Sequence, residues 1–295
     1  MKILVTGGTG QLGKDCVKVL EERHQVTPLG SRDLDITDSK AVKIFLQVEK
    51  PDVIINCAAF AQVDACETEK DLAWRVNVEG PKNLAAAAGK NGSRLIHIST
   101  DYVFDGKKPV PEAYTEQDET GPISYYGATK LAAEKALAEN ADRFAILRTA
   151  WMYGADGRSF LKTILWLALA DPYRQIRVVN DQFGSPTWSL SLARQIEKVI
   201  DAQLAGIFHA TSEGYCTWFE LARSFLMQME VPDAVVPCST AEYPTPAARP
   251  ANSILENRRL KEAGQNIMAD WRDDLAQFVC LFRDRLMNEV KAYRI

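Results

Sequence analysis

The first thirteen residues of this 295-residue chain constrain its fold more than any other segment. Residues 1–6 form an apolar run typical of a buried strand, and they lead directly into the turn Gly7-Gly-Thr-Gly-Gln-Leu-Gly13. Residues 14–22 then carry apolar side chains at helical spacing. A strand that turns through glycines into a helix opens a dinucleotide-binding βαβ unit, so the sequence predicts an α/β fold.

The three spaced glycines have separate physical roles in such a turn. Gly7 lets the chain leave the strand sharply, Gly10 lets the backbone approach a pyrophosphate, and Gly13 lets the helix pack against the strand. The N-terminus of the helix faces the phosphate charge in this arrangement. The spacing differs by one residue from the commoner Gly-x-Gly-x-x-Gly, and a tight turn without a ligand is the alternative interpretation.

The end of the second expected strand indicates which nicotinamide cofactor would bind. Residues 24–29 form that strand, and Gly30, Ser31 and Arg32 follow it. A site selective for NAD usually has an acidic residue here for the ribose 2′-hydroxyl, but the first one is Asp33. Ser31 and Arg32 suit a 2′-phosphate instead, so the sequence favours NADPH. NADH remains an alternative if Arg32 is solvated or stacks on adenine.

Strands and helices continue to alternate up to about residue 150. Residues 52–56, 94–99 and 143–149 favour strands, and residues 72–90 and 125–140 favour helices. This alternation predicts a Rossmann-type, doubly wound parallel sheet with helices on both faces. Ligands of such a sheet gather at the carboxyl ends of its strands, which is where the candidate residues lie.

The rhythm changes after Thr149, and proline-containing loops appear at residues 180–187 and 243–250. We expect residues 1–150 to form the NAD(P)-binding domain and residues 151–295 to form mainly a smaller mixed substrate-binding lobe. A segment near residues 174–205 is expected to return to the larger domain.

Tyr126 and Lys130 form a candidate catalytic pair in the helix expected at residues 125–140. Residues four apart lie on one face of a helix, and a nearby ammonium lowers the pKa of a phenol from about 10. The hydroxyl group of Thr100 could hydrogen-bond the oxygen that the tyrosine protonates. Tyr-x-x-x-Lys alone is weak evidence, but with the glycine turn it predicts proton transfer to a carbonyl or from an alcohol.

Composition narrows the partners and the compartment. The net charge of −4 disfavours a nucleic-acid or anionic-membrane surface. No apolar stretch has the length of a membrane span and no signal sequence precedes the first strand, so a cytoplasmic enzyme is expected. The six cysteines and three histidines are scattered without metal-ligand spacing, and no metal site is expected.

Longer motifs occur along the whole chain. They are Val5–Gly13, Leu34–Thr37, Asn56–Ala59 with Val63, Asp64 and Glu67, Ser99–Gly106, Tyr126–Lys130, Arg148–Gly154, Asp181–Thr187, and Tyr243–Pro250 with Ser253. Through them the chain resembles the extended short-chain dehydrogenase/reductases and, within these, the dTDP-4-dehydrorhamnose reductase family. Residues 99–106 and the ending Arg249-Pro-x-x-Ser253 are particular to the reductases, whereas the glycine turn and Tyr-x-x-x-Lys occur throughout the superfamily.

The resemblance implies roles for individual residues. The catalytic residues are Thr100, Tyr126 and Lys130. Residues that match cofactor contacts are Gly7, Gly10, Gln11, Leu12, Gly13, Ser31, Arg32, Asp35, Ile36, Ala58, Ala59, Tyr126 and Lys130. Residues that match sugar-nucleotide contacts are Tyr102, Trp151, Gln182 and Arg249. The alternatives are a core aromatic for Trp151 and a solvated side chain for Arg249.

The implied reaction reduces the 4-keto group of a dTDP-sugar with hydride from NADPH. Tyr126 donates a proton to the developing alkoxide, and Thr100 orients the oxygen. Lys130 keeps the pKa of the tyrosine low and binds the nicotinamide ribose. Related dehydratases carry an Asp-Glu pair after the threonine; Tyr102 follows Asp101 here, which disfavours a dehydratase.

Two alternatives stay open. A related sugar-nucleotide reductase or 4-epimerase would use the same three residues. A cofactor-binding regulatory subunit of the methionine adenosyltransferase type would share the fold, but the intact set of Thr100, Tyr126 and Lys130 favours an enzyme. The exact sugar and the oligomeric state are not determined by the sequence, and a homodimer is one option.

Overall fold

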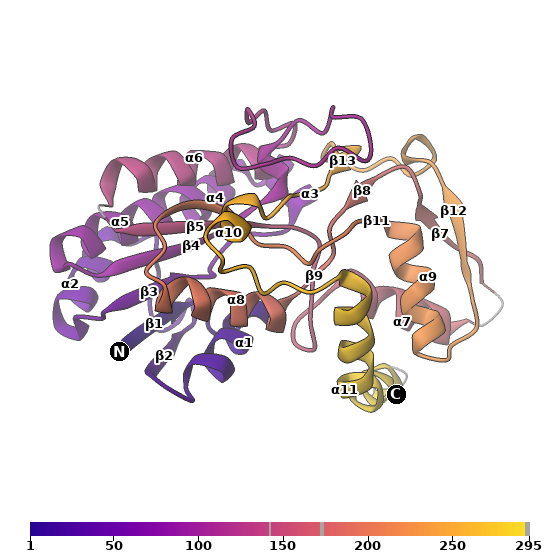
Figure 1. The fold of residues 1–295 in the computed structure, drawn as a ribbon, viewed down its shortest axis with the longest axis horizontal. Helices are drawn as coiled ribbons and strands as arrows, with labels where there is room; N and C mark the ends of the chain where they lie inside the picture. The colour runs from indigo at the N-terminus through magenta and orange to yellow at the C-terminus, as the bar shows by residue number, and fades with distance from the viewer. Residues whose placement is uncertain (142, 172–173, 293–295) are drawn as a thin grey trace.

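The computed structural model describes residues 1–141, 143–171 and 174–292, and it places a larger α/β domain beside a smaller lobe (Figure 1). Residues 172–173 and 293–295 of the expected smaller lobe lie outside the described residues. Six parallel strands form the main sheet in the order β10-β5-β4-β3-β1-β2. Their bounds are β1 (Lys2–Thr6), β2 (Gln25–Leu29), β3 (Val53–Asn56), β4 (Arg94–Thr100), β5 (Phe144–Thr149) and β10 (Gly206–His209).

The register of the sheet aligns the carboxyl ends of its central strands. Asn56 at the end of β3 pairs with Thr6 of β1 on one side and with His97 of β4 on the other. Thr100 at the end of β4 pairs with Thr149 at the end of β5. Because every neighbouring pair is parallel, the loops that follow these strands meet at one edge of the sheet.

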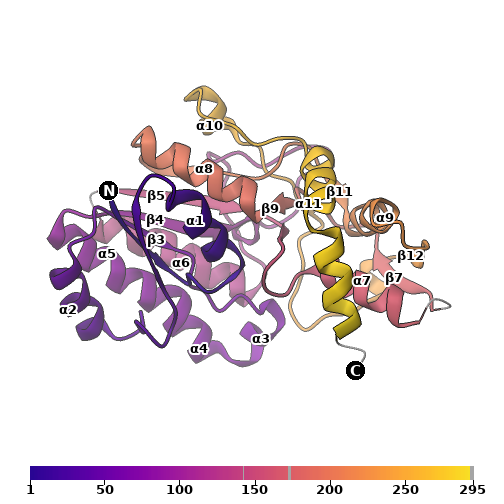
Figure 2. The ribbon, with the colours of Figure 1, turned by 90° about the horizontal axis from the view of Figure 1, so that it is seen from below.

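Helices cover both faces of the sheet, which confirms the predicted doubly wound architecture. α1 (Gln11–Leu20) and α8 (Ser189–Asp201) lie side by side on one face (Figure 2). α2 (Ser39–Glu49), α5 (Gly80–Asn91) and α6 (Tyr125–Asn140) cover the other. Successive strand residues point to opposite faces, so Ile3 and Val5 pack toward α1 and α8 while Leu4 packs toward α2 and α5.

The helix expected over residues 72–90 is interrupted in the structure. α4 (Lys70–Trp74) continues through one π-helical turn (Arg75–Glu79) into α5. Asn77 of this turn is buried: its Oδ1 accepts from the Phe60 backbone N–H at 2.8 Å, and its Nδ2 donates to Thr129 Oγ1 at 3.1 Å. These tertiary hydrogen bonds join the loop after β3 to α6, and apolar periodicity carries no signal of them.

The smaller lobe has its own apolar core. Its elements are α7 (Phe160–Ala170), β7 (Ile176–Val179), α9 (Trp218–Gln228), β12 (Val235–Cys238) and α11 (Trp271–Ala292). Phe225 of α9 and Phe278 of α11 are buried in this core with Trp188. Among the described residues, no helix is long and apolar enough to cross a membrane.

The segment expected near residues 174–205 divides between the two bodies. β7 pairs with β12 in the smaller lobe, whereas α8 packs on α1 and the main sheet. The turn in between contains β8 (Phe183–Gly184) and β9 (Thr187–Trp188). β8 pairs with β11 (Cys216–Thr217) and β13 (Asn252–Ser253), so three distant segments meet beside the carboxyl edge. Pairing with β12 and packing in the lobe core hold β7 in the smaller lobe, and neither is visible in the local sequence.

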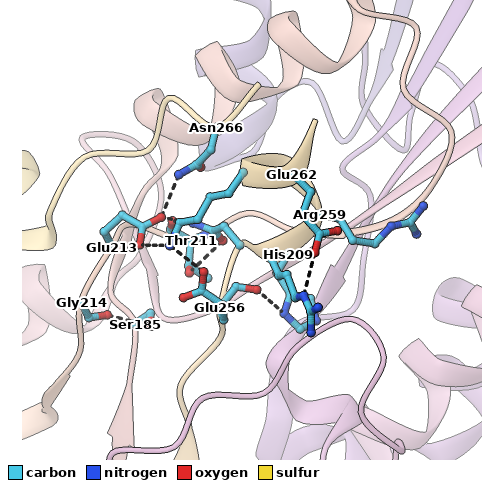
Figure 3. Close-up of polar contacts among 12 residues, drawn as sticks. Ser185, His209, Thr211, Glu213, Gly214, Glu256, Arg259, Glu262 and Asn266 are labelled. Atoms are coloured by element: carbon cyan, nitrogen blue, oxygen red, sulfur yellow. Dashed lines mark hydrogen bonds and ion pairs between the residues drawn. The ribbon is translucent and has the colours of Figure 1, made fainter. Parts of the chain in front are cut away.

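A polar network fastens the loop after β10 to the segment around α10 (Arg258–Glu262) (Figure 3). Glu213 Oε1 accepts from Asn257 Nδ2 at 2.9 Å and from Asn266 Nδ2 at 2.8 Å. Glu116 Oε1 accepts from the backbone N–H of His209 at 2.9 Å. The network holds the chain where it passes from the larger domain to the smaller lobe for the last time.

Candidate active site

The carboxyl edge of the main sheet opens into a cavity of about 430 Å³, called here the central cavity. Its lining includes Gly7, Gly10, Gln11, Leu12, Gly13, Ala59, Thr100, Tyr126, Lys130 and Trp151. The structure therefore brings the three expected catalytic residues together with the glycine turn. They arrive from different elements, because Thr100 ends β4 whereas Tyr126 and Lys130 lie in the first turns of α6.

Close backbone contacts restrict the glycine turn at several positions, and Gly7 and Gly13 are two of them. Gly7 has a φ of +66°, and a Cβ there would lie 2.7 Å from the Ala58 backbone nitrogen. A Cβ on Gly13 would overlap the Gly7 carbonyl oxygen. The close approach of these backbones places the N-terminus of α1 at the cavity, where its free N–H groups can meet an anion.

A neighbouring cavity of about 310 Å³, the glycine-turn cavity, lies between the ends of β1, β2 and β3. It shares Gly7 and Gly10 with the central cavity, and its lining also includes Ser31, Asp35, Ile36, Ala58 and Ala59. Arg32 is exposed next to Ser31 and does not line this cavity. Two adjoining cavities on either side of a glycine turn fit the two halves of a dinucleotide.

The phenol of Tyr126 is held as a neutral acid. Burial of its hydroxyl group, and then the charge of Asp101, raise the pKa of Tyr126, while a hydrogen bond with Thr100 opposes the rise. The sequence-based expectation was that Lys130 lowers this pKa. Lys130 does not do so here, because its Nζ donates to the carbonyl oxygen of Ile98 in β4 at 2.6 Å. Burial in turn lowers the pKa of Lys130 to about 8.

Asp101 is a site residue whose role the sequence did not reveal. Its carboxyl group is buried, which raises its pKa to about 6, and its Oδ1 accepts from Thr100 Oγ1 at 2.9 Å. Thr100 Oγ1 accepts in turn from the Tyr102 backbone N–H at 3.2 Å. The carboxyl group of Asp101 therefore determines where the Thr100 hydroxyl proton points.

Trp151 forms the wall between the central cavity and the smaller lobe. It has a φ of +45° and stacks on Trp218 of α9, with ring centroids 3.6 Å apart and an angle of 7° between the planes. Its ring also contacts Gly184, where any side chain would collide with it. Trp151 thus combines packing against the lobe core with a surface exposed to the cavity. Trp218 was missed by sequence reasoning, because stacking across 67 residues leaves no local pattern.

A third cavity of about 630 Å³, the lobe cavity, lies next to Trp218. Its lining includes Tyr102, Gln182 and Arg249, which the sequence analysis matched to sugar-nucleotide contacts. Arg249 Nη2 pairs with Asp64 Oδ1 at 2.9 Å, so this guanidinium is held at the cavity by an acid from α3 (Val63–Thr68). Tyr102 and Trp218 also border a small space beside Thr100 and Tyr126 that connects the lobe cavity to the central one.

Among the described residues, no group of three or more histidine, cysteine or acidic side chains is arranged to hold a metal ion. The cavities instead offer backbone N–H groups, hydroxyl groups and several cations, among them Lys130 and Arg249. Such a set can bind phosphates and protonate an oxygen.

The chain is similar to known reductases in both sequence and structure. A family model described as the RmlD substrate binding domain matches residues 1–283. The dTDP-4-dehydrorhamnose reductase of Burkholderia thailandensis is 39% identical over 289 residues, covering 92% of this chain and 96% of the relative. A crystal structure of a dTDP-4-dehydrorhamnose reductase from Clostridium acetobutylicum is 43% identical, with a TM-score of 0.93, and the match covers 96% of this chain and 100% of that one.

A further solved structure includes a cofactor. The dTDP-4-dehydrorhamnose reductase from Bacillus anthracis, in complex with NADP, is 38% identical to this chain with a TM-score of 0.91. The match covers 95% of this chain and 98% of that one.

Proposed function

This chain belongs to the RmlD substrate binding domain family, and from that premise we propose that it reduces dTDP-4-dehydro-L-rhamnose to dTDP-L-rhamnose with NADPH. One observation supports this most directly: Thr100, Tyr126 and Lys130 line the same cavity as the glycine turn. That places a proton donor beside the proposed cofactor site. Several relatives that match more than 90% of this chain carry reductase names.

The residues present fit a nicotinamide dinucleotide. Gly7 and Gly13 let the backbone segments of the turn pack closely, which leaves the N-terminus of α1 at the central cavity. We assign the pyrophosphate to this turn, the adenosine half to the cavity of Ser31, Asp35 and Ile36, and the nicotinamide half to the central cavity. When bound, NADPH supplies the hydride.

The protein's own part in the reaction is to hold and deliver a proton. Because burial raises the pKa of Tyr126, the phenol stays protonated through the neutral range and can donate to the oxygen at C4 of the sugar. Thr100 donates its hydroxyl proton to Asp101 in the structure, and it would turn this proton to the C4 oxygen when the sugar binds. Lys130 would contact the nicotinamide ribose.

The smaller lobe would bind the sugar nucleotide. Arg249 supplies a planar cation for the diphosphate, and Tyr102 and Gln182 line the same cavity. Trp151 would separate the sugar from the lobe core. On this assignment the cofactor domain is residues 1–150 together with α8 and β10, and the remaining residues bind substrate.

We place this activity in the cytoplasm. The reaction draws on NADPH, and all six cysteines are free thiols, which suits a reducing compartment.

A direct assay tests the proposed function. Loss of NADPH absorbance with dTDP-4-dehydro-L-rhamnose, and formation of dTDP-L-rhamnose by chromatography, is the expected result. A UDP-sugar epimerisation assay is run in parallel. Tight NADPH binding by calorimetry without turnover of any 4-keto sugar nucleotide would contradict a reductase and favour a regulatory protein.

Replacement of Arg32 should change the choice of cofactor. Arg32→Ala is expected to raise the KM for NADPH by roughly 10–100-fold, because the 2′-phosphate loses a charge-assisted hydrogen bond. The KM for NADH should stay the same. Arg283→Ala is the matched control, since Arg283 pairs with Glu230 in the smaller lobe. Equal changes for both cofactors would show that Arg32 does not read the 2′ position.

A further inference from the structure

A buried polar chain runs through the main sheet beneath the central cavity. It links Thr6 of β1, Asn56 of β3 and His97 of β4, all of them buried, and ends at Lys130. Thr6 Oγ1 donates to Asn56 Oδ1 at 2.7 Å, and Asn56 Nδ2 lies 3.0 Å from His97 Nδ1. His97 Nε2 lies 3.3 Å from Lys130 Nζ. The proposed mechanism does not use His97.

The orientation of the Asn56 amide is determined by a backbone group. The N–H of Ala58, which can only donate, lies 3.2 Å from Asn56 Oδ1. The amide oxygen must therefore occupy this place, and Asn56 Nδ2 must be the atom that faces His97. Since Nδ2 donates, His97 Nδ1 has to accept.

This bond determines the tautomer of His97. Burial, and then the charge of Lys130, lower the pKa of His97 far below its usual range, so the ring is neutral. A neutral imidazole whose Nδ1 accepts carries its proton on Nε2. The Nε2–H therefore faces Lys130 Nζ, where an ammonium group would need an acceptor.

Several groups bear on the charge of Lys130. The groups around it are the Ile98 carbonyl oxygen, Cys57 directly after β3, Glu134 one turn further along α6, and Tyr126. Arg148 pairs with Glu134, and the charge of Asp101 acts on Tyr126. Glu134 and Cys57 favour the ammonium, whereas burial disfavours it. The Nε2–H of His97 places a partly positive hydrogen next to Lys130 Nζ, on the side of the sheet. This hydrogen also disfavours the charged form of Lys130.

We propose that His97 is a positioning residue whose Nε2–H shifts Lys130 toward the neutral amine and so determines the pH at which the site loses its cation. The inference rests on the proposed function. In the proposed mechanism Lys130 contacts the nicotinamide ribose, so loss of its charge weakens that contact and lowers kcat/KM for the reduction. The decrease of kcat/KM at alkaline pH, its alkaline limb, then follows the loss of the proton from Lys130. With His97 present, this decrease occurs at a lower pH than it would without the imidazole.

Two substitutions separate the two sides of the imidazole ring. In His97→Asn the amide oxygen can take the place of Nδ1 and accept from Asn56, but nothing replaces Nε2–H. In His97→Gln the longer side chain can return an N–H to the Nε2 position. The alkaline limb should move up by about one pH unit in His97→Asn and remain in place in His97→Gln. His24→Asn is the matched control, because His24 lies outside the three cavities.

The tautomer itself is measured in the wild-type protein without turnover. The chain has three histidines, so ¹⁵N-histidine labelling gives few signals, and loss of one signal pair in His97→Gln assigns His97. We expect a protonated Nε2 and a bare Nδ1 at neutral pH. A protonated Nδ1 overturns the inference, as does a His97→Asn profile that matches the wild type or a His97→Gln profile that shifts equally. If His97→Asn does not fold, the tautomer measured in the wild-type protein decides the inference. If no reduction is seen, the proposed function fails, and the tautomer still tests the contact between His97 and Lys130.

Discussion

Tyr126→Phe is expected to lower kcat for NADPH-dependent reduction by roughly 10²–10⁴-fold, the usual size of a lost general acid. The substitution removes only the hydroxyl group that bonds Thr100 and leaves the ring, which packs edge-on against Tyr102 with centroids 5.9 Å apart. NADPH affinity should therefore change little. Single-turnover kinetics and calorimetric titration of NADPH measure the two quantities separately.

The neighbouring residue provides the control for this experiment. Tyr125→Phe makes the same chemical change one position earlier in α6, where the ring lies 5.3 Å from Lys70 Nζ and outside the central cavity. It should keep wild-type kcat. A loss below tenfold in Tyr126→Phe would remove this tyrosine as the proton donor, and an equal loss in both variants would indicate damage to α6.

Glu134→Leu should destabilise the fold by about 3–5 kcal/mol, the cost of a buried charge left without its partner. Glu134 accepts from Arg148 at 2.9 and 2.7 Å and from Ser99 Oγ at 2.5 Å, and all three side chains are buried between β4, β5 and α6. Among the described residues Arg148 Nη1 already has no hydrogen-bond partner, so the Phe104 ring is the main contact left to the guanidinium once the carboxylate is gone. Urea unfolding followed by circular dichroism measures the loss.

Two further variants show whether the effect belongs to the buried charge. Glu262→Leu removes an exposed carboxylate that pairs with Arg258 at i,i+4, and about 1 kcal/mol or less is expected. Glu134→Leu combined with Arg148→Met should recover most of the lost stability, because both charges are then absent. If Glu134→Leu alone lost no more stability than Glu262→Leu, water would have to reach Arg148 in the folded protein.

Local sequence patterns were sufficient for the larger domain. The apolar runs at β1, β3, β4 and β5, the glycine turn and α6 all occur where periodicity and turn chemistry predict them. Each depends on neighbours within one strand or one helix, which is the range over which side-chain spacing carries information. The π-helical turn at residues 75–79 was not predictable, since its Asn77 bonds are made to Phe60 and Thr129.

The candidate site divides in the same way. The residues that match family motifs, such as Thr100 and Arg249, could be named from the chain alone. Their contacts could not be predicted: Asp64 lies 185 residues from the arginine it holds, and Trp218 meets Trp151 only through the packing of α9.

The sequence by itself determined the fold class, the glycine turn and the spacing of Tyr126 and Lys130, because these depend on residues close together in the chain. Only the tertiary structure decided the protonation chemistry of those residues. It directs Lys130 toward Ile98 and His97, and it aligns Asn56 between β1 and β4 so that the imidazole has one tautomer. A proton's position depends on burial and on which donors face which acceptors, and both are properties of the packed sheet.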